Sequence, residues 1–487
     1  MRSISTPHRK PASTVQQRAA RSVAAPIAEE ANSGSSAAAS ADDRRNGNGH
    51  AERPALGGLN DVVVSAARSG DHISIFHLLQ HVFHAPAMAE FQASQDAPLY
   101  EPCDRLLARY RDQLLGHVQI VNRTLQFDSI ALPISEIHHL GVLPELRRRG
   151  IGSQLLAAAE AKIVEEGGQL ALLRTSDPQF FARRGWFVCG RHCFTTATAR
   201  DVLAELTNQP PLATEASPLS QQRPLPTVRL WRQVEQDAVA RLYNAHARQS
   251  RGAIERNHEY WRWLVSRHGY DRIYVAVDEA QTQDASREHS NIVGYAVVSD
   301  ARILELVTSP DSPAAARQLL SRACSDAIER GESTIRLDAP ADHPLHALMQ
   351  SAGGRFVSSE SEQGDVLMGK LFEPWQLLEQ MRSDLHGRAR AAGLTLPVEF
   401  GLCVDDTKRQ IVISRRSTKL NQDKTGRSYL TSNPQQLCRL LLGEINVASA
   451  EAAGKIQAST RVAVELANVL FPQRPLWFSP LDHQPAE

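Results

Sequence analysis

The sequence lacks an excess of either charge, and it lacks long apolar runs. Its 487 residues include 54 lysines and arginines against 54 aspartates and glutamates, so the formal net charge is zero. Balanced charge gives no global attraction to nucleic acid or to an anionic membrane. No apolar run approaches the roughly 18 residues that a transmembrane helix needs. We therefore expect no nucleic-acid partner and no membrane span, and any anion site must be built locally.

Cysteine is also scarce, with six residues scattered over the whole chain. Such usage does not frame a disulfide scaffold and fits a reducing compartment, so we expect a cytoplasmic protein. Cys189 and Cys193 flank His192, but three candidate ligands fall short of a structural metal site. We expect the two cysteines to share one face of a strand as core residues, and we expect no metal.

The first 59 residues contain few large apolar side chains. A segment of this kind cannot bury enough surface to fold, so residues 1–59 are predicted to be a disordered tail. The first 28 residues carry basic side chains but no acidic one, which is also the composition of an organelle transit peptide. The remaining length is sufficient for about three domains.

Residues 60–208 have the pattern of one α/β unit. A strand and a helix open it near Asp61, and the segments 104–112 and 114–122 then resemble a hairpin, followed by a strand over 134–142. The spacing of apolar residues predicts a helix from Ser153 to Glu166. A buried strand, a short helix and a closing strand, "GWFVCGRHCFTT", are expected to complete the unit.

Two further units follow a Pro-rich linker at residues 209–227. Residues 228–372 repeat the order of elements of the first unit, including a helix from about Ser312 to Arg330, and this suggests a duplicated fold. Residues 373–487 combine strand candidates with later helices and are predicted to be a small α+β domain. The fold class is therefore α/β (α+β).

The stretch "LGVLPELRRRGIGSQLL", from Leu140 to Leu156, carries the clearest chemical signal. A strand ends in Val142-x-Pro144, then Arg147-x-x-Gly150-x-Gly152 leads into the predicted helix. Backbone N–H groups at a helix start can converge on one phosphate, and glycine lets the phosphate approach closely. A solvated Arg-rich turn is the alternative, but the flanking strand and helix favour a phosphate cradle.

These residues resemble the GNAT (Gcn5-related) N-acetyltransferase family over Asp61 to about Leu206. The strand "EIHHLGV", the loop "RRRGIG" and the segment "FFARRGW" carry the resemblance. It implies a GNAT fold with a mixed central sheet and acetyl-CoA as the cosubstrate. It also implies a set of acetyl-CoA contacts, which comprises Leu140, Gly141 and Val142 on the strand and Arg147, Arg148, Arg149, Gly150, Ile151 and Gly152 in the loop.

Transfer of an acetyl group to an amine needs a base. Glu136 is the first candidate, because it lies six residues before Val142, where some members of the family place a catalytic glutamate. Alternatively, Glu136 is a strand residue that faces solvent or pairs with Arg109 or Arg111. His138 and His139 follow on the same strand, and either one can be a base, a binding group or a packed residue.

The position that often supplies a tyrosine acid in the family aligns with Phe181, which has no proton to give. Water, Ser176 or a residue from another domain then remains as the acid, or the reaction proceeds without a strong acid.

The overall organisation resembles the enhanced-intracellular-survival (Eis) type acetyltransferases. The resemblance implies a second, degenerate GNAT-like domain, and Pro310 and Pro313 there replace the phosphate loop and remove N–H donors. It also implies a C-terminal domain like sterol carrier proteins and a homo-oligomer. In such enzymes the C-terminal carboxylate acts as base, which makes Glu487 the second candidate, while Trp477 and Pro480 are expected to anchor the chain end.

The sequence thus predicts an acetyl-CoA-dependent N-acetyltransferase acting on a primary amine of a small molecule or peptide. A non-catalytic acyl-CoA or lipid-binding protein is the alternative, because Phe181 and the carrier-like region favour it.

Overall fold

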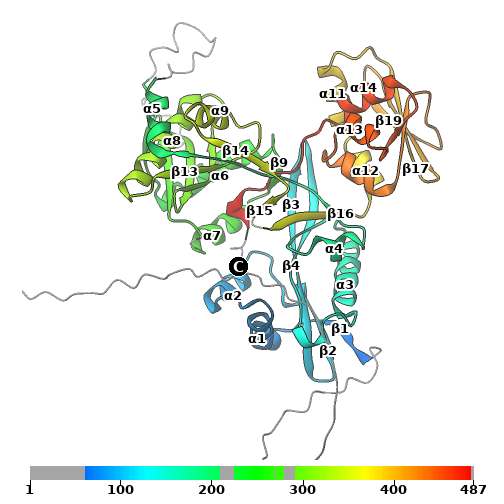
Figure 1. Cartoon of the computed structure of the whole chain (residues 1–487), viewed down its shortest axis with the longest axis horizontal. Coiled ribbons are helices and arrows are strands. Elements are labelled where there is room, and N and C mark those ends of the chain that lie inside the picture. The colour runs from blue at the N-terminus through cyan, green and yellow to red at the C-terminus, as the bar shows by residue number, and fades with distance from the viewer. Residues whose placement is uncertain (1–60, 209–223, 268, 279–290, 363, 484–487) are drawn as a thin grey trace, which may run out of the picture. The chain divides into compact units, whose positions relative to one another are not determined.

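The structure is a computed structural model that describes residues 61–208, 224–267, 269–278, 291–362 and 364–483. The predicted tail, most of the predicted linker and Glu487 lie outside the described residues. The described chain from residue 61 onward contains three mixed sheets, each with one parallel pair of strands (Figure 1). The mixed α/β fold class predicted from the sequence is confirmed.

The first sheet includes the strand that precedes the loop with Gly150 and Gly152, and the helix that follows this loop packs on the sheet. Its main path runs β1-β2-β3-β4-β5-β16-β15, with β6 and β9 pairing at its sides. The strands are β1 (Val63–Ala66), β2 (Arg105–Tyr110), β3 (Gln113–Phe127), β4 (Ile130–Val142), β5 (Leu170–Thr175), β6 (Phe187–Val188), β9 (Arg251–Ile254), β15 (Ser361–Glu362) and β16 (Asp365–Leu371). Strands β1 to β4 are antiparallel, and β4 and β5 are parallel, joined by a helical crossover.

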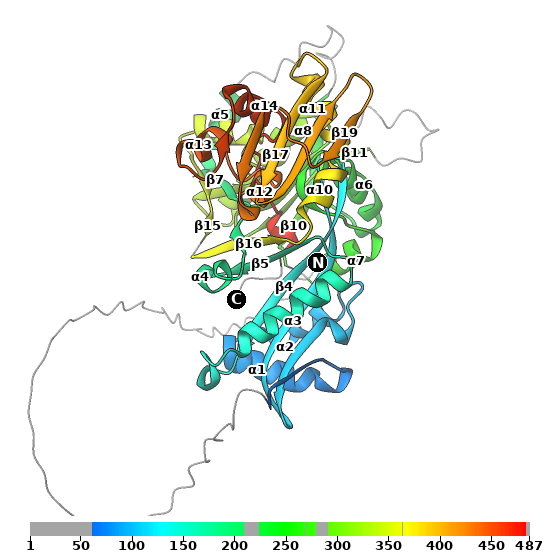
Figure 2. The same cartoon turned by 90° about the vertical axis from the view of Figure 1, so that its right-hand side faces the viewer.

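Helices cover the two faces of the β3–β4 pair. The crossover helix α3 (Ile151–Glu165) lies along these strands (Figure 2). It buries the apolar face that the sequence predicted, including Leu155 and Ile163. On the other face α1 (His72–Phe83) packs so closely that a Cβ on Gly141 would lie 2.8 Å from the Phe83 ring. The shorter helices α2 (Met88–Gln95) and α4 (Pro178–Ala182) complete this region.

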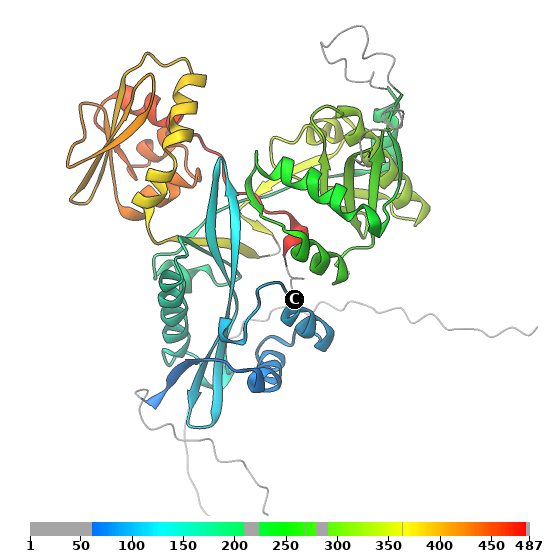
Figure 3. The ribbon, with the colours of Figure 1, turned by 180° about the vertical axis from the view of Figure 1, so that it is seen from behind.

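The second sheet is apolar on both faces. Its order is β14-β7-β13-β12-β11-β10-β8, formed by β7 (His192–Thr198), β8 (Thr227–Leu230), β10 (Arg272–Val277), β11 (Ile292–Ser299), β12 (Arg302–Thr308), β13 (Thr334–Asp338) and β14 (Arg355–Ser359). One face packs against α5 (Ala199–Asn208), α8 (Pro313–Glu329) and α9 (Pro344–Ser351), and the other against α6 (Gln236–Ala247) and α7 (His258–Ser266) (Figure 3). The parallel β12–α8–β13 crossover repeats the β4–α3–β5 crossover of the first sheet.

These two sheets exchange strands: β7 joins the second sheet, and β9, β15 and β16 join the first. The segment "GWFVCGRHCFTT" was expected to close the first sheet, but β7 pairs with β13 and β14 of the second. The place beside β5 is taken by β16, which follows the second sheet in sequence. Gly190 interrupts the expected strand with a φ of +79°, so Cys189 and Cys193 do not share a face of one strand. Both cysteines are buried, as expected.

The third region forms a five-stranded sheet with helices. Its strands are β17 (Val398–Val404), β18 (Thr407–Ile413), β19 (Thr418–Gln422), β20 (Tyr429–Ser432) and β21 (Gln457–Ala458), and its helices are α10 (Pro374–Gln380), α11 (Arg382–Ala391), α12 (Pro434–Leu441), α13 (Val447–Ala452) and α14 (Arg461–Leu470). Its apolar interior is continuous with Leu125, Phe127 and Leu132 at the far end of the β3–β4 hairpin. None of the helices in the described ranges is long and apolar enough to cross a bilayer.

Candidate active site

A β-bulge opens the first sheet beside the glycine motif. His117 pairs with Gly141, whereas Gln119 pairs with His138, so His139 and Leu140 together oppose one residue of β3. His139 adopts a positive φ of 51° to accommodate the extra residue. The parallel pairing of β4 with β5 extends from Ile134 to Ile137 and no further, so the two strands separate before the bulge. The separation leaves space at the carboxyl ends of the two parallel strands, where ligands of α/β sheets commonly bind.

The loop after β4 presents backbone donors to this space. Arg148 and Gly150 have φ values of 62° and 86°, and α3 begins directly after Gly150. In the part of the chain that the structure describes, the N–H groups of Arg149, Gly150, Ile151 and Gly152 donate to no acceptor. Four adjacent unpaired donors at a helix N-terminus are an anion-binding arrangement.

The loop and the bulge line one cavity of about 1410 Å³. Pockets for drug-sized ligands commonly measure about 300–1,000 Å³, so this cavity has room for two substrates. Of the acetyl-CoA contacts predicted from the sequence, all except Arg149 line it. The Arg147 guanidinium turns back to donate to the Val142 carbonyl at 3.2 Å, which braces the loop against the end of β4.

Glu136 lies at the opposite end of the cavity, where it is largely buried and paired. Its carboxylate lies 3.0 Å from Nε of Arg123 on β3 and 3.3 Å from Nε2 of His138. The alternative prediction that Glu136 pairs with Arg109 or Arg111 is wrong, because Glu136 pairs with Arg123 and Arg109 binds Asp71. Burial raises the pKa of Glu136, but Arg123 and His138 outweigh burial and hold this pKa well below its usual range.

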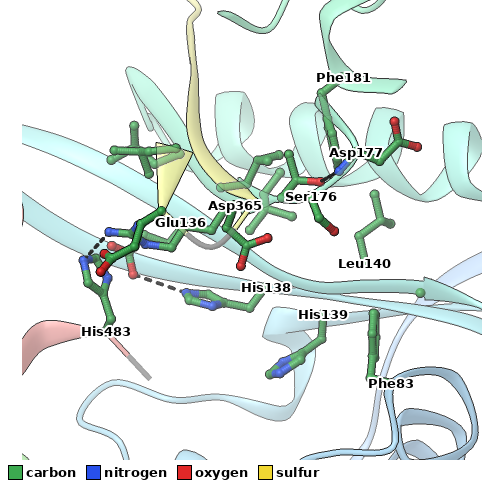
Figure 4. Close-up of a pocket in the computed structure, with 18 of the residues that line it drawn as sticks. Phe83, Glu136, His138, His139, Leu140, Ser176, Asp177, Phe181, Asp365 and His483 are labelled. Atoms are coloured by element: carbon green, nitrogen blue, oxygen red, sulfur yellow. Dashed lines mark hydrogen bonds and ion pairs between the residues drawn. The ribbon is translucent and has the colours of Figure 1, made fainter. Parts of the chain in front are cut away.

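His138 and the end of the described chain complete this group of polar residues (Figure 4). Burial lowers the pKa of His138, and the opposing effect of Glu136 does not restore its ordinary value. His483 accepts a hydrogen bond from Nη2 of Arg174 at 2.5 Å, while the other terminal nitrogen of Arg174 lies 3.4 Å from His192. Burial, reinforced by Arg174, holds the pKa of His483 well below its ordinary value.

The chain segment 477–483 forms one wall of the cavity. The Trp477 N–H donates to the Arg251 carbonyl on β9, and Trp477 and Pro480 both line the cavity. Asp482 binds the buried Arg256 through two hydrogen bonds of 2.8 Å. Arg256 in turn makes a bidentate pair with Glu305 on β12, so the segment is tied to the second sheet.

The side chain of Phe181 is buried in an aromatic cluster. Its ring centroid lies 4.9 Å from that of Phe180 and 6.0 Å from that of Trp186, both in edge-to-face geometry. It supplies no proton, as the sequence indicated. Ser176 lies in the same cavity wall and is exposed, so a hydroxyl is present nearby (Figure 4). Among the described residues, no group of three or more His, Cys, Asp or Glu side chains is arranged to hold a metal ion.

Arg123, Arg174 and His483 were not predicted as site residues. Arg174 had a detectable signal, because a guanidinium at the carboxyl end of the apolar strand "QLALLRT" lies where a ligand site is expected. Arg123 and His483 had none, since their places in the site depend on contacts with residues far away in sequence.

The fold and the cavity combine a mixed sheet, in which β4 and β5 separate, with an anion-binding arrangement at the start of α3. Residues 63–189 match the family model described as the acetyltransferase (GNAT) domain. Residues 63–189 therefore carry an acetyltransferase (GNAT) domain.

Comparisons with individual proteins extend this assignment. An uncharacterized N-acetyltransferase of Chlorobaculum tepidum is 33% identical over 98 residues, which are 20% of this chain and 59% of that relative, so less than two thirds of the relative is matched. A GCN5-related N-acetyltransferase of Anabaena variabilis has a similar structure, with a TM-score of 0.63 and 13% identity over 86% of this chain and 99% of that one. Eis1 of Mycobacterium abscessus also has a similar structure, with a TM-score of 0.57 and 18% identity over 86% of this chain and 99% of that one. The fold is thus shared over most of the described chain.

Proposed function

We propose that the protein transfers the acetyl group of acetyl-CoA to a primary amine of a small molecule or peptide. The observation that carries the proposal is the row of four N–H groups at the start of α3 that have no acceptor among the described residues, beside a strand whose pairing with β5 ends at Ile137. The pyrophosphate of acetyl-CoA would bind these donors. Its pantetheine arm would extend along Leu140, Gly141 and Val142, much as a peptide adds to a sheet edge.

The rest of the cavity would hold the amine. Glu136, His138 and His483 lie beyond the bulge, on the side away from the loop, and Asp300 and Asp365 line the same cavity. These groups can accept a proton or neutralise an ammonium. Backbone N–H groups near Leu140 would stabilise the oxyanion of the tetrahedral intermediate, a contribution typically worth about 3–4 kcal/mol for each donor.

A direct assay tests the proposal. Purified protein is mixed with acetyl-CoA and, separately, with polyamines, aminoglycosides and lysine peptides, while free thiol and acetylated product are measured. We expect thiol release that depends on the amine. Calorimetry measures acetyl-CoA binding in parallel. If the protein binds acetyl-CoA but forms no product with any amine, the non-catalytic acyl-CoA-binding alternative is supported instead.

A further inference from the structure

The contacts of Glu136 indicate a different role for it than for His138. The Glu136 carboxylate is enclosed by an ion pair on one side and an imidazole on the other, with its side chain 13% exposed. A carboxylate that is stabilised in its charged form is a weak base, because protonation would break the ion pair with Arg123. Glu136 is therefore suited to hold another group in place.

That group is His138, which is two residues nearer the bulge on the same face of β4. A carboxylate only accepts hydrogen bonds, so the 3.3 Å contact places the imidazole proton on Nε2. The Nδ1 lone pair is then free. Nδ1 contacts no partner among the residues that the structure describes, and it is not enclosed, because His138 lines the cavity.

The pair is held by a chain of contacts that reaches the C-terminal segment. Arg123 donates a hydrogen bond to the hydroxyl of Tyr260 on α7, and this hydroxyl lies 3.3 Å from Asp482. Asp482 is fixed by Arg256. The orientation of Glu136 is therefore set by Arg123 on β3, which α7 and the segment 477–483 hold in place in turn.

We propose that His138 is the general base of the acetyl transfer, with Glu136 and Arg123 as its positioning residues; this rests on the proposed function. As the amine nitrogen forms its bond to the thioester carbon, its proton passes to Nδ1 of His138. The carbon–sulfur bond then breaks, and its electron pair leaves with sulfur as the thiolate. The imidazolium releases the proton, which the thiolate takes up, so amide and thiol form and His138 is neutral again.

The route also accounts for Phe181. A protonated imidazole can return its proton to the leaving thiolate, so a tyrosine hydroxyl is not needed at position 181. General acid and general base are then one residue at two stages of the reaction.

Kinetics of variants at position 138 test the proposal. His138→Ala should lower kcat/KM by about 10²- to 10⁴-fold while the Kd for acetyl-CoA stays unchanged. The wild-type rate should fall as pH decreases below 6.5, because protonation removes the Nδ1 lone pair, and His138→Ala should lose this dependence. Added imidazole should restore part of the rate of His138→Ala. His81→Gln, at an exposed histidine of α1, is the matched control.

Two further measurements distinguish the other candidates. Glu136→Gln should lower kcat/KM by about 10²-fold and should lower the pKa of His138, which NMR follows with His138→Gln as the assignment standard. A protein with a C-terminal amide in place of the terminal carboxylate should retain the rate and the pH dependence. If the amide protein loses the fall in rate at acid pH, and His138→Ala keeps both this fall and the wild-type rate, the base is the chain terminus.

The proposal is overturned if His138→Ala keeps the wild-type rate and pH profile. It is also overturned if the rate falls without rescue by imidazole and with the pH profile intact, since His138 would then be structural. An unchanged pKa of His138 in Glu136→Gln would contradict the coupling even if no amine acceptor is found. Absence of thiol release by the wild type contradicts the proposed function instead.

Discussion

At the scale of single residues, the two glycines of the loop after β4 occupy their positions for different physical reasons. Gly150 has a φ of +86°, where a side chain is strained whatever the space around it. Gly152 has no such requirement, and a Cβ there would meet its nearest neighbour, the Phe180 ring, at 3.7 Å. The protein fold alone therefore tolerates a side chain at residue 152, and its glycine leaves space in the cavity.

Gly152→Leu is expected to separate binding from folding. Leucine has a higher helix propensity than glycine, so the free energy of unfolding should stay equal or rise by up to about 1 kcal/mol. The side chain would fill the space next to the unpaired N–H groups, so the Kd for acetyl-CoA should rise at least about tenfold. Thermal unfolding and calorimetry measure the two effects.

Gly167→Ala serves as the control for backbone strain, because Gly167 has a φ of +82°, a Cβ there would have no neighbour within 4 Å, and the residue does not line the cavity. It should cost stability of about 1–3 kcal/mol and leave acetyl-CoA binding unchanged. Unchanged acetyl-CoA affinity in Gly152→Leu would contradict the assignment of the cradle.

At the scale of elements, the C-terminal segment depends on a buried ionic group. Arg256 has no exposed side-chain surface, and Glu305 and Asp482 are each 4% exposed. The Arg256 guanidinium also stacks over the Tyr243 ring at 3.8 Å, and the Tyr295 hydroxyl donates to Glu305. Every partner in this group has several contacts, as a buried charge requires.

Glu305→Gln should destabilise the protein by about 1–3 kcal/mol at neutral pH, because it weakens the hydrogen bonds of this buried carboxylate to Arg256, which keeps Asp482 as its counter-charge. Burial raises the pKa of Glu305, but Arg256 outweighs burial and lowers this pKa below its usual value of 4.5. The stability from Glu305 is therefore present above pH 4.5 and is lost as pH falls through the lowered pKa. The difference in unfolding temperature between wild type and Glu305→Gln should shrink over that acid range.

Glu465→Gln is the comparison for that measurement, because Glu465 forms an exposed pair with Arg461. It should leave the unfolding temperature nearly unchanged at every pH. An equal effect of Glu305→Gln and Glu465→Gln would contradict the role of the buried group.

Elements with local signals were predictable from the sequence. The helix expected over 153–166 is Ile151–Glu165, and the helix expected over 312–330 is Pro313–Glu329. Both have apolar residues at helical spacing and a defined start. The loop between β4 and α3 was predictable for the same reason, since strand, glycines and helix are consecutive in the sequence.

Features that depend on distant partners were not predictable. The bulge at His139 arises from its register against β3, which no local pattern reveals. The pairing of Glu136 with Arg123 required the correct choice among several arginines on neighbouring strands. The segments of β7 and β16 are both seven residues long and contain buried and partly exposed positions, so their sequences do not indicate which sheet each one joins.

At the scale of the whole molecule, the exchange of β7 and β16 makes the two sheets interdependent. β16 pairs with β5 over six residues from Val366 to Leu371, and it also pairs with β6. Lys370 on β16 adds an ion pair to Glu160 on α3 at 2.7 Å. The GNAT domain found at residues 63–189 is therefore completed by a strand outside that range.

A fragment of residues 57–208 should accordingly fail to fold. It would leave the edge of β5 unpaired and would expose α5, whose apolar face packs on the second sheet. We expect no cooperative thermal transition and no acetyl-CoA binding by the fragment, in contrast to the full chain. A fragment that unfolds cooperatively and binds acetyl-CoA would show that β16 is dispensable.

The position of β16 also determines when the first sheet can form during synthesis. Because the ribosome makes the chain from its N-terminus, β5 is complete almost 200 residues before its neighbour β16 is available. During that interval the edge of β5 has no neighbouring strand, and a long segment of the chain must be synthesised before β16 can cover it. The first sheet is thus completed late in translation, and the second sheet must be largely made before the first can be finished.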